Sequence, residues 1–202
     1  MVQGYLPRRV SRLQHRVELR HPREHVRKDE PVARSTADPG ARNELAPIVL
    51  SVVREHRSRP GYRLLAEDEF AIRLVARAGH LAGRAVANDP SLREQLARLA
   101  QNICAETLCQ ACLSPNPREQ NQGYAELGAY LYRLAFNALK RQGRPTDLAE
   151  DCTQEALRQV WQHIERCREP GAFLRWAAVI QMRIVQRHLR RQRDDLLLPE
   201  ED

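Results

Sequence analysis

Residues 173–193 read FLRWAAVIQMRIVQRHLRRQR, and this stretch decides the fold class of the C-terminal part of the chain. Its apolar residues recur at steps of three and four, which is the spacing of one face of an α-helix. They are Phe173, Ala177, Ile180, Ile184, Val185 and Leu189. We therefore expect a helix that packs inward through this stripe.

Arginines dominate the second half of the same stretch. Residues 181–193 contain five arginines and no acidic residue. Four of them share one helical face: Arg183, Arg187, Arg190 and Arg191. A solvated charged face usually mixes Glu with Arg, because neighbouring turns then form ion pairs. A row of cations alone can neutralise several phosphates of a nucleic-acid strand. We expect nucleic-acid binding here, with a solvated charged face as the alternative.

Two more helices are predicted directly upstream. Residues 124–140 place Leu127, Leu131 and Leu134 on one side. Thr146 and Asp147 then supply a cap for a helix that reaches about Arg166. The predicted apolar side of that helix comprises Leu148, Cys152, Ala156, Leu157, Val160, Trp161 and Ile164. Its other side carries a compact acidic and amide patch made of Glu150, Asp151, Gln154, Glu155 and Arg158.

Residues 44–113 form a helical extension in front of this block. The first stretch with helical periodicity starts at Glu44 and stops at Arg59-Pro60-Gly61. A second stretch runs from Ala66 to Ala87, with Ile72 among its apolar residues, and a third runs from Leu92 to Leu113. No segment alternates apolar and polar residues over the length of a strand. The sequence therefore predicts an all-α protein.

The net charge of +7 lies mostly in the first segment of the chain. Residues 1–43 hold ten basic and five acidic residues, with prolines scattered among them and no sustained period. They are interpreted as a flexible basic arm. A solvated tail, or a start codon placed too far upstream, is the alternative reading.

The composition of the chain excludes several classes of protein. No apolar run approaches the roughly 20 residues that cross a bilayer, and the N-terminus lacks the apolar core of a secretory signal. We expect a soluble, cytoplasmic protein without a membrane partner. The five cysteines are an odd number without framework spacing, which suits a reducing compartment.

No residue pattern indicates a metal site or an active site. Cys104, Cys109 and Cys112 are interleaved with Leu108 at helical spacing, so we expect them to pack in the core. His163 and Cys167 supply only two ligands. The sequence also lacks a Ser/His/Asp set and a glycine-rich phosphate loop. We expect no metal, no cofactor and no enzymatic activity.

The C-terminal residues resemble a known family. The order of certain residues is similar to region 2 of extracytoplasmic-function (ECF) sigma factors. That order is Asp147-Leu148-Ala149-Glu150-Asp151-x-x-Gln154-Glu155, then Trp161, then Phe173-x-x-Trp176-x-x-x-Ile180, then His188-Leu189-Arg190-Arg191. These proteins are the promoter-specificity subunits of bacterial RNA polymerase. The resemblance covers residues 123–193, roughly a third of the chain.

The resemblance implies two binding surfaces. Asp151, Gln154, Glu155 and Arg158 would dock on the clamp helices of the polymerase β′ subunit. The loop from Arg168 to Ala172 would capture a base flipped out of the promoter −10 element, and Arg175 and Trp176 would hold the non-template strand. Core packing is the alternative role for Trp176.

The chain departs from the family pattern at several places. The family usually continues after Ile180 with Ala-Arg-Asn and then an Asp, whereas Gln181, Met182, Arg183 and Arg187 stand at those positions here. The family also has a second domain that reads the −35 element. Residues 194–202 look like the start of an acidic linker, so we expect either a region-2-only protein or a separate −35-reading chain. Residues 44–113 have no assigned counterpart, and an anti-sigma protein is a candidate regulator.

These observations together predict a sigma factor that binds core RNA polymerase and melts promoter −10 DNA. Two alternatives remain open. One is a helical adaptor or regulatory protein that keeps a sigma-like domain without opening DNA. The other is a nonspecific nucleic-acid binder.

Overall fold

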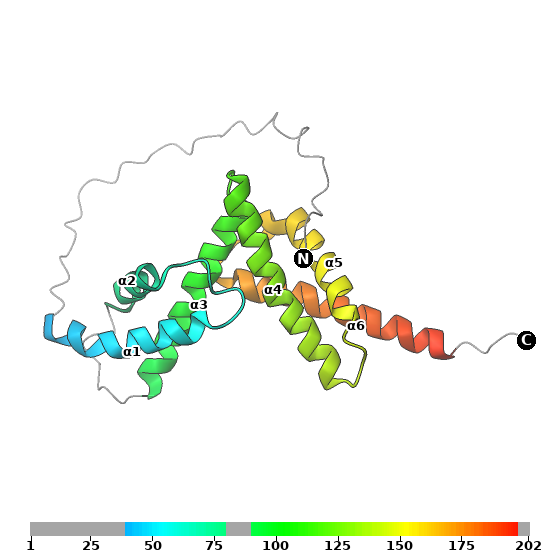
Figure 1. The fold of residues 1–202 in the computed structure, drawn as a ribbon, viewed down its shortest axis with the longest axis horizontal. Coiled ribbons are helices and arrows are strands. Elements are labelled where there is room, and N and C mark those ends of the chain that lie inside the picture. The colour runs from blue at the N-terminus through cyan, green and yellow to red at the C-terminus, as the bar shows by residue number, and fades with distance from the viewer. Residues whose placement is uncertain (1–38, 80–89, 198–202) are drawn as a thin grey trace, which may run out of the picture. The chain divides into compact units, whose positions relative to one another are not determined.

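The computed structural model describes residues 39–79 and 90–197, with the side chains of residues 46–79 and 90–191. These ranges belong to one compact unit. Every regular element in them is helical, which confirms the all-α prediction (Figure 1). The elements are α1 (Pro39–Arg57), α2 (Glu67–Ala78), α3 (Pro90–Leu113), α4 (Pro117–Arg141), α5 (Leu148–His163), the 3-10 turns η2 (Ile164–Arg166) and η3 (Pro170–Ala172), and α6 (Phe173–Leu197).

Local sequence sets the ends of the central helices. At the start of α4 the Asn116 side chain accepts a hydrogen bond from the Arg118 backbone N–H at 3.0 Å, and Pro117 occupies the first turn. The chain leaves α4 through Gly143, whose φ of 63° suits a residue without a side chain. Asp147 then caps α5 by accepting a hydrogen bond from the Leu148 backbone N–H at 3.0 Å.

Several predicted boundaries differ from the structure or lie beyond what it describes. α4 begins at Pro117 and not at residue 124, where the sequence placed its start. α1 begins at Pro39, inside the segment predicted as the arm 1–43, and the rest of that arm lies outside the described residues. α2 ends at Ala78 and not at Ala87, where the sequence placed its end, and residues 80–89 lie outside the described residues. α6 continues to Leu197, into the predicted tail.

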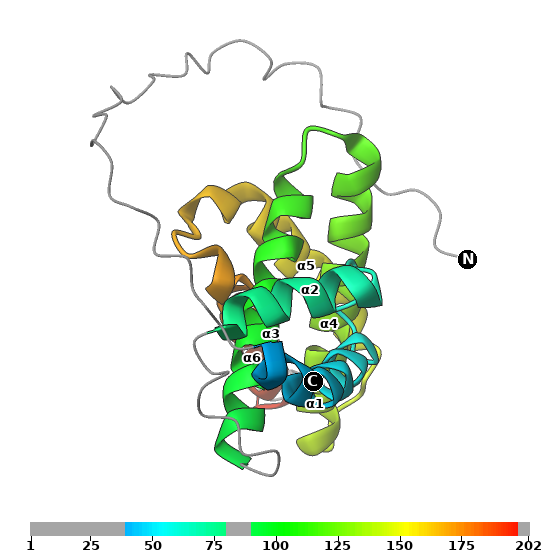
Figure 2. The ribbon, with the colours of Figure 1, turned by 90° about the vertical axis from the view of Figure 1, so that its left-hand side faces the viewer.

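Two hydrophobic clusters share the helix α3. The first half of α3 packs with α1 and α2, and its second half packs with α4, α5 and α6; Figure 2 shows these helices around α3. The α3 residues of the first cluster are Leu92, Leu96, Ala100, Ile103 and Cys104, and those of the second are Ala105, Leu108, Cys109 and Cys112. α3 is therefore the element through which the N-terminal helices reach the helices that carry the candidate site.

α3 and α4 form a hairpin with close backbone contact at Gly123. A β-carbon placed on Gly123 would lie 2.9 Å from the Cys112 backbone nitrogen and 3.0 Å from the carbonyl carbon of Ala111. Only glycine allows the two helices to approach this closely at that position. A second link joins this hairpin to the α1–α2 connection, where the Gly61 backbone N–H donates to Glu126 Oε2 at 3.1 Å.

The cysteines of α3 are core residues, as predicted. Cys104, Cys109 and Cys112 are all buried. Burial raises the pKa of Cys104 to about 12, because it disfavours the charged thiolate. Ile72, an apolar residue of the predicted second helix, is 69% exposed.

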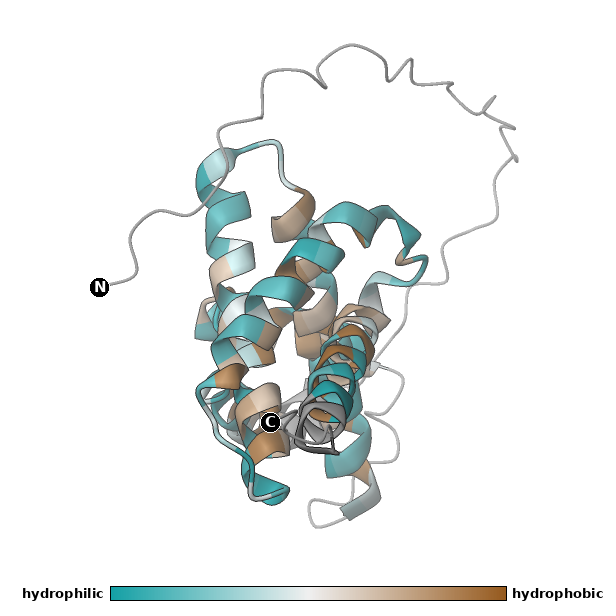
Figure 3. Cartoon of the chain, turned by 90° about the vertical axis from the view of Figure 1, so that its right-hand side faces the viewer, coloured by the Kyte–Doolittle hydropathy of each residue, from teal (hydrophilic) through white to brown (hydrophobic). Residues whose placement is uncertain are grey.

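The surface of the helices is mixed in polarity. Figure 3 shows polar and apolar residues alternating around the helices, as amphipathic packing requires. Within the described ranges, no helix combines the length and the apolar character needed to cross a bilayer.

Candidate functional site

The exposed face of α5 carries the predicted acidic and amide patch. Asp151, Gln154 and Arg158 are exposed, and they recur at steps of three and four along one side of the helix. The opposite side is buried through Ala149, Cys152, Thr153, Ala156 and Val160. The Thr153 hydroxyl donates to the Ala149 carbonyl at 2.7 Å, so this polar residue is satisfied inside the core. The buried side holds the patch outward on a rigid helix.

Trp161 belongs to this exposed face and not to the apolar side where the sequence placed it. Its side chain is 56% exposed. Trp161 lies three residues after Arg158 and seven after Gln154, which puts all three on one helical face. The apolar pattern missed this because Trp161 stands next to Val160, and hydrophobic character alone does not separate adjacent residues. Exposed Trp and Arg are the residue types that most often anchor protein interfaces.

Glu155 lies at the border between α5 and α6, and it pairs with two residues of α6. Its Oε1 accepts a hydrogen bond from Arg187 Nη2, and its Oε2 lies 3.3 Å from His188 Nε2. Burial acts to raise the pKa of Glu155, but hydrogen bonds from Arg187 and His188 outweigh it, so the pKa lies below its ordinary value. Glu155 and Arg187, assigned to different surfaces by the sequence, are therefore partners of each other.

The outward face of α6 is a stripe of exposed arginines. Arg175, Arg183 and Arg190 recur along this face, and Val179 and Gln186 lie between them. All five side chains are exposed, as is the neighbouring Arg191. None of the four arginines has an ion-pair partner in the described part of the chain. From Arg175 to Arg190 the stripe spans about 22 Å at the helical rise of about 1.5 Å per residue.

Trp176 is half-buried at the start of α6. It stacks on Phe173, with ring centroids 6.0 Å apart and an interplanar angle of 26°, and it packs against the larger hydrophobic cluster. Core packing, one of its two predicted roles, is thus a feature of the structure.

Gln181, one helical turn beyond Ala177, is fully buried, and neither polar atom of its amide has a hydrogen-bond partner in the described residues.

The loop between α5 and α6 contains the predicted base-binding segment. Arg168, Glu169 and Pro170 are exposed, while Gly171 is half-buried against α3. The loop is ordered by its own backbone: the Ala172 N–H donates to the Glu169 carbonyl at 2.9 Å. Arg168 is thereby held on the surface near the start of α6, on the same segment as Arg175.

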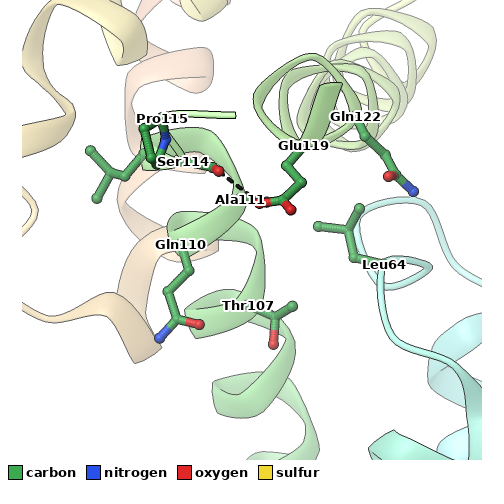
Figure 4. A pocket seen from close by; sticks show the side chains of 9 residues that line it. Leu64, Thr107, Gln110, Ala111, Ser114, Pro115, Glu119 and Gln122 are labelled. Carbon is green, nitrogen blue, oxygen red and sulfur yellow. Dashed lines mark hydrogen bonds between the residues drawn. The ribbon is translucent and has the colours of Figure 1, made fainter. Parts of the chain in front are cut away.

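A separate open pocket lies at the α3–α4 turn. Its volume is about 520 Å³, and it is lined by residues of α3, of α4 and of the α1–α2 connection, including Leu64, Ala111 and Gln122 (Figure 4). Ser114 donates to Glu119 Oε2 at 2.7 Å on its wall. None of the predicted site residues lines this pocket.

The arrangement of His, Cys, Asp and Glu side chains tests whether the described residues could form a metal site. Across residues 39–79 and 90–197, no group of three or more His, Cys, Asp or Glu side chains is arranged to hold a metal ion. His163 and Cys167 are both half-buried, and neither joins a larger ligand set in that part of the chain.

Comparison with known proteins identifies the segment that carries both surfaces. Residues 124–194 match the family model described as sigma-70 region 2. No curated protein and no solved structure matches the chain. The family match begins inside α4 and ends inside α6, so it includes the exposed face of α5 and the arginine stripe. The match covers about a third of the chain, and α1, α2 and α3 lie outside it.

Proposed function

We propose that this protein is a transcription initiation factor of the ECF subclass, which binds core RNA polymerase and recognises promoter −10 DNA. One observation carries the proposal. Within the segment that matches sigma-70 region 2, the Glu155–Arg187 pair joins α5, which carries an exposed acidic and amide face, to α6, which carries an exposed arginine stripe. Such a factor acts by binding and not by catalysis, and it works in the cytoplasm with the polymerase.

The face of α5 is the proposed polymerase-binding surface. Asp151, Gln154 and Arg158 offer charge and hydrogen bonds, and Trp161 adds an exposed aromatic side chain to the same face. Protein interfaces combine such an anchor with a surrounding polar rim. The β′ clamp helices of the polymerase are the proposed partner.

The α6 stripe is the proposed DNA-binding surface. Arg175, Arg183 and Arg190 stand on a helix whose other side is buried, so their spacing is fixed before DNA binds. A fixed row of guanidinium groups can contact phosphates and release their counterions. Arg168 and the exposed part of Trp176 would extend this surface toward an unpaired strand, where aromatic rings can stack on bases.

The polymerase contact is tested by co-purification with core RNA polymerase. We expect Asp151→Arg to reduce binding by tenfold or more, because it reverses a charge in the centre of the proposed interface. Asp68→Arg is the matched control, since Asp68 is exposed on α2, far along the chain from this face. If both variants bind like the wild type, the α5 assignment is wrong.

Transcription separates an initiation factor from an adaptor. We expect run-off transcription from −10-containing promoters when the protein is added to core polymerase, with or without a −35-reading chain supplied in trans. Polymerase binding without any transcript would support the adaptor. DNA binding without polymerase binding would support a nonspecific nucleic-acid binder.

A further inference from the structure

The base-binding loop rests on a helix that lies outside the sigma-70 match. A β-carbon placed on Gly171 would lie 3.3 Å from Glu106 Oε1 and 3.6 and 3.7 Å from Cβ and Cγ of Asn102. Both of these residues belong to α3. The absence of a side chain at Gly171 thus brings the loop backbone directly against the polar side of α3.

The polar groups of α3 beside this loop differ in what they already bind. Glu106 is held by the guanidinium of Arg77 from α2, with contacts of 2.9 and 2.6 Å. The ion pair compensates the carboxylate charge, which would otherwise repel a nucleic-acid strand. Asn102 is exposed, and its amide has no hydrogen-bond partner in the described part of the chain.

A free amide at this position suits the recognition of a base edge. The Asn side chain offers one acceptor and two donors in one plane, the arrangement that pairs with the donor and acceptor groups of a nucleobase. An extruded base exposes such edges, whereas a stacked and paired base does not. A β-carbon added to the loop residue Gly171 would touch Asn102, so the amide stands beside the loop that would hold the base.

We propose that Asn102 is a specificity-determining residue, which hydrogen-bonds the nucleobase captured by the loop from Arg168 to Ala172. The base site would then be shared between the segment that matches sigma-70 region 2 and the preceding helix α3. Arg77 and Glu106 position that helix edge, and Asn102 reads the base. This inference rests on the proposed function, because it requires the loop to capture a base.

The experiment uses the full chain and a pool of short single-stranded DNAs of random sequence. Captured DNA is sequenced, and the base frequencies are compared between the wild type, Asn102→Ala and Gln101→Ala. Gln101 is the matched control because it is also an exposed amide on α3, one position away and on another side of the helix. Asn102→Gln tests whether a displaced amide alters the preferred base.

The expected result is a base preference of the wild type that Asn102→Ala reduces by about tenfold at one position, as for the loss of a bidentate base contact. Gln101→Ala should keep the full preference. A preference that survives Asn102→Ala would overturn this inference while leaving the proposed function intact. A wild-type protein that captures no DNA, alone or with core polymerase, would overturn the proposed function itself. Unchanged thermal midpoints establish that the variants fold.

Discussion

Glu155 of α5 accepts a hydrogen bond from the guanidinium of Arg187 in α6, and the same carboxylate approaches His188. The pair joins the two helices that carry the proposed polymerase and DNA surfaces. It also leaves the Nε atom of Arg187 buried without a partner in the described residues. Arg187 is therefore a structural contact between α5 and α6, set back from the exposed stripe formed by Arg175, Arg183 and Arg190.

This pair predicts a specific acid dependence of stability. The pKa of Glu155 is lower in the folded protein than its ordinary value of 4.5, so its ionised form stabilises the folded state. That contribution is fully present above the ordinary value and is lost as the pH falls through the folded-state pKa. We expect Glu155→Gln to lower the thermal midpoint at neutral pH by a few degrees, because partly exposed ion pairs contribute about 1 kcal/mol or less.

Thermal unfolding followed by circular dichroism from neutral to acidic pH would measure this effect. The difference between the wild type and Glu155→Gln should shrink as the carboxylate becomes protonated. Glu165→Gln serves as the control, because Glu165 is exposed and has no ion-pair partner in the described part of the chain. A difference that stays constant with pH would contradict the electrostatic origin.

The arginines of α6 should differ in their effect on the salt dependence of DNA binding. We expect Arg183→Ala and Arg190→Ala each to reduce the slope of log affinity against log salt by about 0.7 to 0.9, the value of one phosphate contact. Arg187→Ala should change it less, because the Glu155 carboxylate already compensates that charge. Fluorescence anisotropy at several salt concentrations gives the slopes.

The same substitution made in the Glu155→Gln protein tests whether Glu155 compensates the charge of Arg187. In the Glu155→Gln protein the Arg187 charge has lost its partner, so Arg187→Ala should now reduce the slope more than it does in the wild type. Equal slopes for all variants and the wild type would remove the stripe from the DNA interface.

The helices were predictable from sequence, because their apolar stripes and breakers are local features. Pro60-Gly61 and Gly143 follow the ends of α1 and α4. Asn116-Pro117 lies at the start of α4, although the apolar pattern placed that start at residue 124. The cross-helix contacts were not predictable in this way. The partner of Arg187 lies 32 residues away on another helix, and sequence spacing within α6 gave no sign of it. The position of Gly171 beside Asn102 of α3 likewise depends on tertiary packing.

The buried amide of Gln181 should cost stability. Its side chain is fully enclosed, and neither amide atom has a hydrogen-bond partner in the described residues. An unsatisfied buried polar group destabilises the folded state by about 1–3 kcal/mol. We expect Gln181→Met, which keeps the length and the unbranched shape of the side chain, to raise the free energy of unfolding by about 1 kcal/mol or more.

Urea denaturation of Gln181→Met and Gln186→Met measures that difference. Gln186 is exposed on the same helix, so its replacement should leave the unfolding free energy nearly unchanged. Destabilisation of Gln181→Met by more than the control would indicate that the amide has a partner, such as an internal water molecule.

The α3–α4 hairpin provides a matched pair of glycines. A methyl group at Gly123 would meet the backbone of Cys112 at 2.9 Å, so the two helices must separate to accept it. A methyl group at Gly128, also in α4, would touch only the end of the Leu157 side chain at 3.4 Å. We expect Gly123→Ala to lower the unfolding free energy by about 1–3 kcal/mol, the usual cost of overpacking. Gly128→Ala should raise it by up to about 1 kcal/mol, because alanine has the higher helix propensity.

Chemical denaturation of the two variants measures these changes in unfolding free energy. The two variants differ only in position along one helix, so changes of opposite sign would locate the close contact between α3 and α4. Equal effects would show that the hairpin can relax at Gly123, and α3 would then hold Asn102 less firmly against the base-binding loop.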